Sequence, residues 1–340
     1  MDSGDLNRSG SKFYMSYMRN DGQLWKGYGN QFNQQVNAKF VQPIGNDSKI
    51  SAFFDWSDIH QFTLPDASPE VIQNLGYNVP DYYNGRQSGL QAAINAANGI
   101  YPAGFEKLSD KTDSAYYEAT NNTQDLFGGI KADLKINDRL TWNTTAYGHG
   151  ETNQTTWTTP YYPSPNGSPL SELVKEPEIR RFGITSQLHY NIAHNEISGG
   201  VWYENNTYLS PMSAYSMPNI IDGKMTSSLP APLGSWKNPF AKIYNQNYST
   251  NTFTAFVNDT YHVFHNLALH FGFKSVLSTT RVGDGYLNQD YYGAGSRITS
   301  SEGLTTAKAF LPHISADWHF LRHHELFFDI SENVHSYAQC

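Results

Sequence analysis

Histidines are the residues of this chain with the most obvious capacity for chemistry, because they gather in two short stretches. One stretch of twelve residues holds His313, His319, His323 and His324. A second, looser group holds His262, His265 and His270. Neutral imidazole is a common metal ligand. Neither group has the His-Glu-x-x-His spacing of a zinc protease, and His323 and His324 fall at an expected turn, where solvated polar residues belong. The sequence therefore predicts neither a metal site nor a cofactor.

Catalytic nucleophiles and acid-base pairs are equally hard to find. The segment 293–297, GAGSR, resembles a nucleophile elbow but has glycine where the serine should stand. Phosphate-binding and dinucleotide-binding glycine patterns are absent. Asp55 and Asp58 could divide acid and base roles, but we interpret them as water-facing charges at the loop-side end of a strand. We expect a protein that is not an enzyme.

Aromatic side chains in the expected loops are the candidate ligand contacts. They form three clusters, which comprise Tyr82, Tyr83, Trp157, Tyr161, Tyr162, Tyr291 and Tyr292. Such rings offer a large, rigid contact area to an amphipathic ligand, and the alternative is that they pack the loops against each other. The basic pair Arg180 and Arg181 could meet an anionic ligand, or could belong to a ladder of charges on the water-facing side of a strand.

Composition excludes several classes of protein. The chain has 23 Lys and Arg against 31 Asp and Glu, a net charge of -8 that argues against a nucleic-acid partner. Charged residues are 16% of the total, too few to keep the chain disordered, and no run of about 18 apolar residues could form a membrane-spanning helix. With 14% aromatic residues and a mean hydropathy of -0.56, the chain fits a wall that faces lipid and water alternately.

The elements that position these residues are predicted from an alternation of connection lengths. Paired strands of roughly ten to fourteen residues meet at short turns and then separate into long polar loops, which is typical of a transmembrane β-barrel. Eleven strands are predicted, at 11–19, 33–44, 48–58, 124–136, 139–150, 180–192, 195–206, 251–263, 267–282, 307–320 and 324–337. The long connections all fall at one end, near 20–32, 59–123, 151–179, 207–250 and 283–306.

Each predicted strand has an apolar face and a polar face. Ile130, Leu134 and Ile136 share one side of their strand, for example, and Lys131 and Lys135 share the other. A soluble antiparallel sandwich would alternate in the same way. The long strands and the recurring loops favour the barrel, as do rings near the short turns that could form an interfacial girdle, namely Trp142, Tyr190, Tyr261, Trp318 and Phe320.

The last 90 residues or so carry a resemblance to a known family. Residues 252–261, TFTAFVNDTY, and 266–274, NLALHFGFK, join an aromatic-alanine strand and an Asp-Thr-aromatic step to a Leu-x-Leu-x-x-Gly return. Residues 309–318, AFLPHISADW, contain an early proline, and residues 326–334, LFFDISENV, end in Ser-Glu followed by a small-plus-apolar pair. Together these segments resemble the barrel of a TonB-dependent outer-membrane receptor.

The resemblance implies an all-β, antiparallel, up-and-down barrel of 22 strands in the bacterial outer membrane, with a plug domain in its lumen. Long extracellular loops would capture a scarce ligand, most often a ferric siderophore, and the TonB complex would act through the plug. The sequence has no evident secretory signal or plug, and eleven strands are about half of 22. Residues 1–340 are therefore expected to be a partial barrel domain that contacts outer-membrane lipid. The alternative is a secreted carbohydrate-binding or carbohydrate-active β protein.

Overall fold

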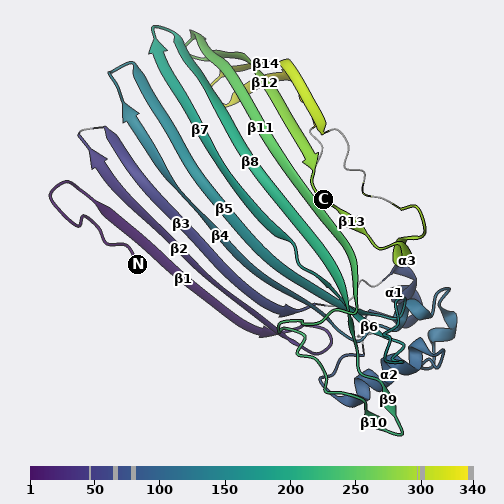
Figure 1. The fold of residues 1–340 in the computed structure, drawn as a ribbon. Helices are drawn as coiled ribbons and strands as arrows, with labels where there is room; N and C mark the ends of the chain where they lie inside the picture. Colours follow the sequence, from purple (N-terminus) through teal and green to yellow (C-terminus); the bar gives the residue numbers. More distant parts are fainter. Residues whose placement is uncertain (46, 64–67, 78–81, 297, 299–302, 336–340) are drawn as a thin grey trace.

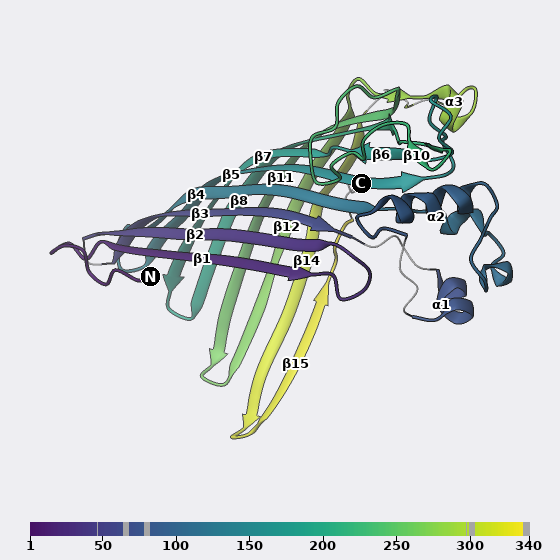
Figure 2. The same ribbon diagram turned by 90° about the horizontal axis from the view of Figure 1, so that it is seen from below.

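The long strands of this chain form one antiparallel sheet. The computed structural model describes residues 1–45, 47–63, 68–77, 82–296, 298 and 303–335 (Figure 1). The long strands of the described part are β1 Lys12–Gln23, β2 Asn30–Ile44, β3 Ser48–Phe62, β4 Ala119–Lys135, β5 Leu140–Thr159, β7 Glu178–Ile192, β8 Asn195–Ser216, β11 Ala241–Phe264, β12 Leu267–Val282, β14 Leu304–Leu321 and β15 His324–Ser331. They follow an arc, so the sheet is a curved wall (Figure 2).

Each long strand pairs with its neighbours along the chain. The order in the 13-stranded sheet is β1-β2-β3-β4-β5, then the short β6 (Ser171–Lys175) and β7 together, then β8-β11-β12-β14-β15. The two-residue strand β13 (Tyr286–Leu287) also pairs with β11. The prediction of one sheet of about eleven strands, joined only between neighbours, is confirmed for the eleven long strands, and the interpretation as a sandwich of two stacked sheets is wrong. Among the described residues, no helix is long and apolar enough to cross a membrane.

The strand β6, Ser171–Lys175, continues the line of β7 and was not expected from the sequence. Both pair with β5 and β8, and only Glu176 and Pro177 separate them. Proline has no N–H to donate, but the Pro177 carbonyl accepts from the Asn153 amide (2.9 Å), and the Glu176 amide donates to the Pro211 carbonyl (2.9 Å). The prediction of a loop over residues 151–179 is therefore wrong at both ends.

Short and long connections lie at opposite ends of the sheet, as predicted (Figure 1). The short turns include residues 136–139, 193–194, 265–266 and 322–323. At the opposite end, the connection after β1 covers residues 24–29 and is shorter than the predicted 20–32. The long connections hold the remaining elements, which are α1 Pro69–Leu75, α2 Gln87–Ala97, the 3-10 helices Phe105–Lys107 and Thr112–Ser114, β9 Ile220–Ile221, β10 Lys224–Met225, β13 Tyr286–Leu287 and α3 Gln289–Tyr292. We call this the loop end of the wall.

One face of the wall is apolar over a band of limited height. On β4, Leu126 and Ile130 point to this face and are exposed, as is Ile136 just beyond the strand. The next position on the same face toward the loops is Gln124, whose amide donates to Asp58 (3.3 Å). About ten residues of tilted strand cross a hydrocarbon layer, which is the length from Leu126 to Ile136. Of the predicted girdle rings, Trp142, Tyr261, Trp318 and Phe320 are exposed, and Tyr190 is half-buried.

On the polar face, glycines make room for large rings that lie along the wall. A Cβ atom at Gly183 would overlap the Tyr147 ring and hydroxyl, so the ring occupies the space above this glycine. The Tyr147 hydroxyl donates to the Glu204 carboxylate (2.6 Å) and accepts from the Trp202 indole N–H (2.9 Å). A residue without a side chain in β7 thus allows tyrosine on β5 to reach β8, and the two hydrogen bonds link these strands across β7.

Candidate ligand-binding loops and a polar cluster on the wall

Tyr82 and Tyr83 lie in the packing between loops. Tyr83 stacks on Phe62 (ring centroids 4.7 Å apart) and meets Tyr117 edge-on (5.3 Å). Both predicted residues pack against a buried cluster that joins three long connections and consists of Leu90, Ala93, Ile94, Tyr117, Leu170 and Met217. The apolar residues of α2 recur at i, i+3 and i+4, so this helix turns one face into that cluster. A ligand contact by Tyr82 or Tyr83 stays a prediction.

The other predicted rings converge from distant parts of the sequence. Tyr162 stacks on Phe240 (5.6 Å) and meets Tyr291 edge-on (5.3 Å), and Tyr291 in turn contacts Tyr292 (5.0 Å). Trp157 and Tyr162 pack against a second buried cluster, which consists of Leu173, Met212, Ala214 and Ile243. The loops after β5 and after β12 therefore form one aromatic surface at the loop end.

Three of these rings remain accessible. Tyr161 is 52% exposed, Tyr291 36% and Tyr292 41%. The Tyr161 hydroxyl donates to Asp110 (3.0 Å), which ties the loop after β5 to the long connection after β3. We call Tyr161, Tyr291 and Tyr292 the exposed rings. Their contact with a ligand also stays a prediction, but they are the residues of the predicted set whose side chains are exposed to solvent.

A buried carboxyl group lies on β6, at the loop end and beyond the apolar band. Burial raises the pKa of Glu172 to about 8, although the Thr158 hydroxyl donates to its carboxylate (2.7 Å) and favours the charged form. Glu172 lies on β6 opposite Thr158 on β5. The group is therefore protonated over much of the ordinary pH range, and its ionisation opposes the packing of β6.

We expect the packing of β6 to weaken as the pH rises. The pKa of Glu172 is higher in the folded protein than in the unfolded chain, where a glutamate pKa is about 4.3. Its contribution to the free energy of unfolding is therefore fully present at pH values below about 4.3. That stabilisation falls by up to about 1.4 kcal/mol per pH unit until the pH passes the folded pKa. Hydrogen exchange of β6 amides, corrected for intrinsic rates, should show faster opening at pH 9 than at pH 5. Glu172→Gln should remove most of this dependence, and an unchanged dependence in that variant would assign it to another group.

The predicted carboxylate and arginine pairs do not act as pairs. Asp55 and Asp58 are three residues apart on β3 and point to opposite faces. Asp58 is buried, where it accepts from Gln34 (3.0 Å) and contacts His60 (3.0 Å), so the interpretation of both as water-facing end charges is wrong for Asp58. Arg180 and Arg181 also point to opposite faces, and Arg180 pairs with Glu178 on the apolar side.

Most histidines of the two sequence groups lie apart from one another. His323 and His324 are at the exposed turn between β14 and β15, as expected. His262 pairs with Glu196 (3.0 Å), and the His270 ring contacts Thr260 (2.9 Å). His319 lies 3.6 Å from Asp317, and these two with Glu325 form an exposed group at the same turn.

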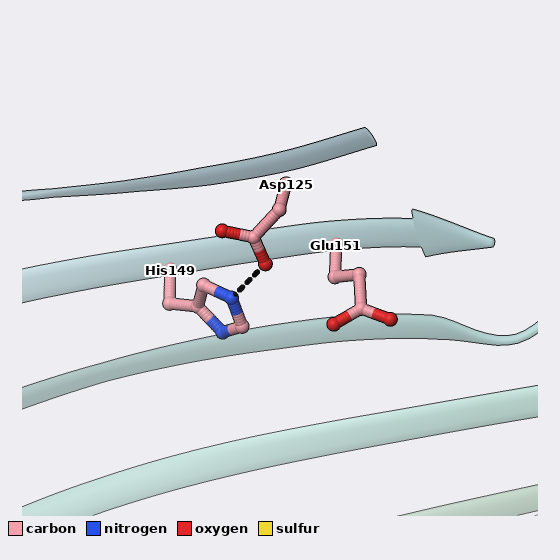
Figure 3. Close-up of side chains that lie close together, drawn as sticks. All are labelled: Asp125, His149 and Glu151. Carbon is pink, nitrogen blue, oxygen red and sulfur yellow. Dashed lines mark hydrogen bonds and ion pairs between the residues drawn. The ribbon is translucent and has the colours of Figure 1, made fainter. Parts of the chain in front are cut away.

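A tighter polar cluster, which the sequence groups missed, lies on the polar face of β4 and β5 (Figure 3). It consists of Asp125, His149 and Glu151, each with one potential ligand atom within 4.8 Å of the others. His149 Nε2 is 2.6 Å from Asp125 Oδ2, and the His149 side chain is 9% exposed. Counting outward from a two-residue turn at Asn137 and Asp138 would pair residue 125 with residue 150, whereas the structure pairs it with residue 151. The turn expected from the sequence would therefore have placed the cluster one residue out of register.

Comparisons with known proteins bear on the fold. No protein-family model matches the chain, and no curated protein sequence matches it significantly. Solved structures do. The ferric-catecholate import receptor Fiu from E. coli K12, in its open form, is 14% identical with a TM-score of 0.61, and the match covers 97% of this chain and 51% of that one.

Two further structures give the same result. The unliganded ferric citrate transporter FecA is 10% identical with a TM-score of 0.62, over 96% of this chain and 39% of that one. The pyoverdine outer membrane receptor FpvA from Pseudomonas aeruginosa PAO1, bound to pyoverdine, is 10% identical with a TM-score of 0.53, over 96% and 43%. The chain spans about half the length, or less, of these structures. Its fold is that of part of the β-barrel of TonB-dependent siderophore receptors.

Proposed function

We propose that this chain is part of the barrel of a bacterial outer-membrane receptor that takes up a ferric siderophore or a similar small ligand. The observation that carries the proposal is one curved sheet with an exposed apolar band on one face and all its long connections packed together at one end. The band would contact outer-membrane lipid, and the loop end would face the outside of the cell. The similar structures are receptors and transporters, which supports a role other than catalysis.

Energy for uptake would reach the ligand through a plug domain that residues 1–340 do not provide. The described residues supply a wall and a loop end, and the TonB complex of the proposal would act on the plug alone. Ligand capture is the step that this chain would perform itself. The exposed rings are suited to it, because aromatic side chains present large rigid surfaces with little conformational entropy to lose.

Fractionation and ligand binding test the proposal separately. We expect the protein to sediment with outer membranes and to require detergent for extraction. Outer-membrane vesicles that carry it should retain one of three labelled ligands, a ferric catecholate, ferric citrate or a ferric pyoverdine, above vesicles that lack it. Recovery in the soluble fraction without detergent would contradict the membrane assignment. Correct insertion with retention of none of the three ligands would contradict the proposed ligand class.

Removing one exposed ring should weaken ligand binding without unfolding the loops. We expect Tyr161→Ala to raise the Kd for the retained ligand about five- to thirtyfold, the effect of losing roughly 1–2 kcal/mol at an aromatic contact. Tyr77→Ala is the matched control, because Tyr77 is 76% exposed in another long connection. It packs against neither of the two buried clusters described above. Equal Kd values for both variants and the parent protein would remove Tyr161 from the ligand site.

A further inference from the structure

Asp125 and Glu151 place two negative charges side by side on the polar face of the wall. They are directly opposite each other in the β4–β5 register. Like charges in that position destabilise a strand pair. Among the described residues, neither carboxylate is in an ion pair with lysine or arginine, and the partner found for Asp125 is His149. The sheet therefore contains a charge conflict that the described side chains leave uncompensated.

His149 is held beside both carboxylates. It lies two residues before Glu151 on β5 and so shares its face. The ring is nine-tenths buried, meets Phe127 edge-on (6.1 Å) and lies in contact with Asp125 (Figure 3). Its other nitrogen, Nδ1, is buried without a hydrogen-bond partner in the described part of the chain. One of the two ring nitrogens of the buried His149 is thus hydrogen-bonded within the described part of the protein, and the other is not.

Arg181 is the cation best placed to neutralise this cluster, and it does not pair with it. It stands opposite His149 in the β5–β7 register. Within the residues that the structure describes, Arg181 is in no ion pair with Asp125 or Glu151, and its Nε is buried without a partner. No lysine or arginine of the described residues thus places its charge between the two carboxylates, and a bound cation would supply one.

We propose that Asp125, His149 and Glu151 bind one divalent transition-metal ion, of the kind represented by Zn²⁺. One imidazole nitrogen and two carboxylate oxygens suit zinc or copper, whereas calcium takes six to eight oxygens. Bonds of about 2.0–2.2 Å hold tetrahedral ligand atoms about 3.3–3.6 Å apart. The ligand atoms now lie within 4.8 Å of one another, so the side chains need to close by about 1 Å. Water would complete the coordination.

Binding requires His149 Nε2 to be free of its proton. The imidazole must bind as a neutral ligand with its lone pair on the metal side. In the present arrangement Nε2 lies 2.6 Å from Asp125 Oδ2, so a proton on Nε2 would be donated to this carboxylate. That proton either leaves to solvent or is replaced by one on Nδ1, and the two carboxylates balance the charge of the ion. No oxidant or reductant is involved.

The experiment uses metal ions alone, with the complete protein purified in detergent. We expect one equivalent of Zn²⁺ to bind in competition with a chromogenic chelator. With Cu²⁺ as the probe, the electron paramagnetic resonance spectrum should show coupling to a single imidazole nitrogen. Because no siderophore is present, this result does not depend on the proposed function, and either proposal can fail without the other.

Variants assign the site. Asp125→Asn, His149→Gln and Glu151→Gln should each weaken Zn²⁺ binding at least about tenfold. His262→Gln is the matched control, because His262 pairs with Glu196 at 3.0 Å and belongs to neither group of three potential metal ligands found in the described residues. The Cu²⁺ spectrum of the parent protein tests the site even where a variant fails to fold. Absence of stoichiometric binding, a spectrum without nitrogen coupling, or equal loss in His262→Gln would overturn the proposal.

Discussion

Ile184→Arg should destabilise the barrel wall by about 2–4 kcal/mol, whereas Thr185→Arg should have an effect of less than about 1 kcal/mol. Both residues are exposed on β7, and they are adjacent, so they point to opposite faces at nearly the same depth. Ile184 pairs with Ala146, well inside the apolar band, where a guanidinium would lose its water. Thr185 is on the polar face, where an added cation stays solvated.

Refolding of the protein from urea into detergent micelles or lipid would measure the two free energies of unfolding. The pair is informative because the introduced residue, the strand and nearly the depth are the same, whereas the face differs. Equal losses in the two variants would mean that the apolar band is not in contact with lipid. The proposed membrane assignment would then fail with it.

Gly183→Ala should have the second large effect, a loss of about 1–3 kcal/mol. The new methyl group would occupy the space of the Tyr147 ring and hydroxyl, so the ring must leave the wall. Its departure would break the hydrogen bonds to Glu204 (2.6 Å) and Trp202 (2.9 Å), and would leave the half-buried Glu204 carboxylate without that donor. The same refolding measurement gives the loss.

Gly150→Ala is the control for this prediction. A Cβ atom at Gly150 would meet nothing within 4 Å, and alanine restricts the unfolded chain more than glycine does, so this variant should be neutral or slightly stabilised. Combining Gly183→Ala with Tyr147→Ala should cause less loss than the sum of the two single changes, because both remove the same network. Additive losses would show that Gly183 acts through some other contact.

The strands were predictable because alternation is a local property. Ile130 and Lys131 show which face each position takes, and the turn at residues 137–138 shows where the chain reverses. β12 was predicted at its observed bounds, and β7 within two residues of them. Strand ends near the loops were predicted less well. β11 begins at Ala241 rather than near residue 251, because residues 244–250 are all polar or aromatic, so the two faces do not differ in polarity there.

The loop end was not predictable by the same means. α2 turns one face toward a cluster that includes Leu170 and Met217, from connections about 80 and 125 residues further along the chain. Burial there depends on contacts that no local pattern reveals. The strand β6 could not be predicted from its sequence, because Pro177 follows it closely and proline normally marks a strand boundary. Asp125 and His149 are far apart in sequence, and only the hairpin register makes them neighbours.

Pairing restricted to neighbouring strands has a consequence for how such chains diverge in evolution. A substitution on one strand mainly affects packing against the two strands beside it. Most positions of the wall require only a side chain whose polarity suits the face on which it lies. Compensating changes can therefore accumulate hairpin by hairpin, while the spacing of strands and turns persists. This explains how chains with 10–14% identity retain TM-scores of 0.53–0.62. By contrast, one residue inserted within a strand would exchange its two faces beyond that point. Divergence in this architecture should therefore consist of many substitutions and loop-length changes, with few insertions inside strands.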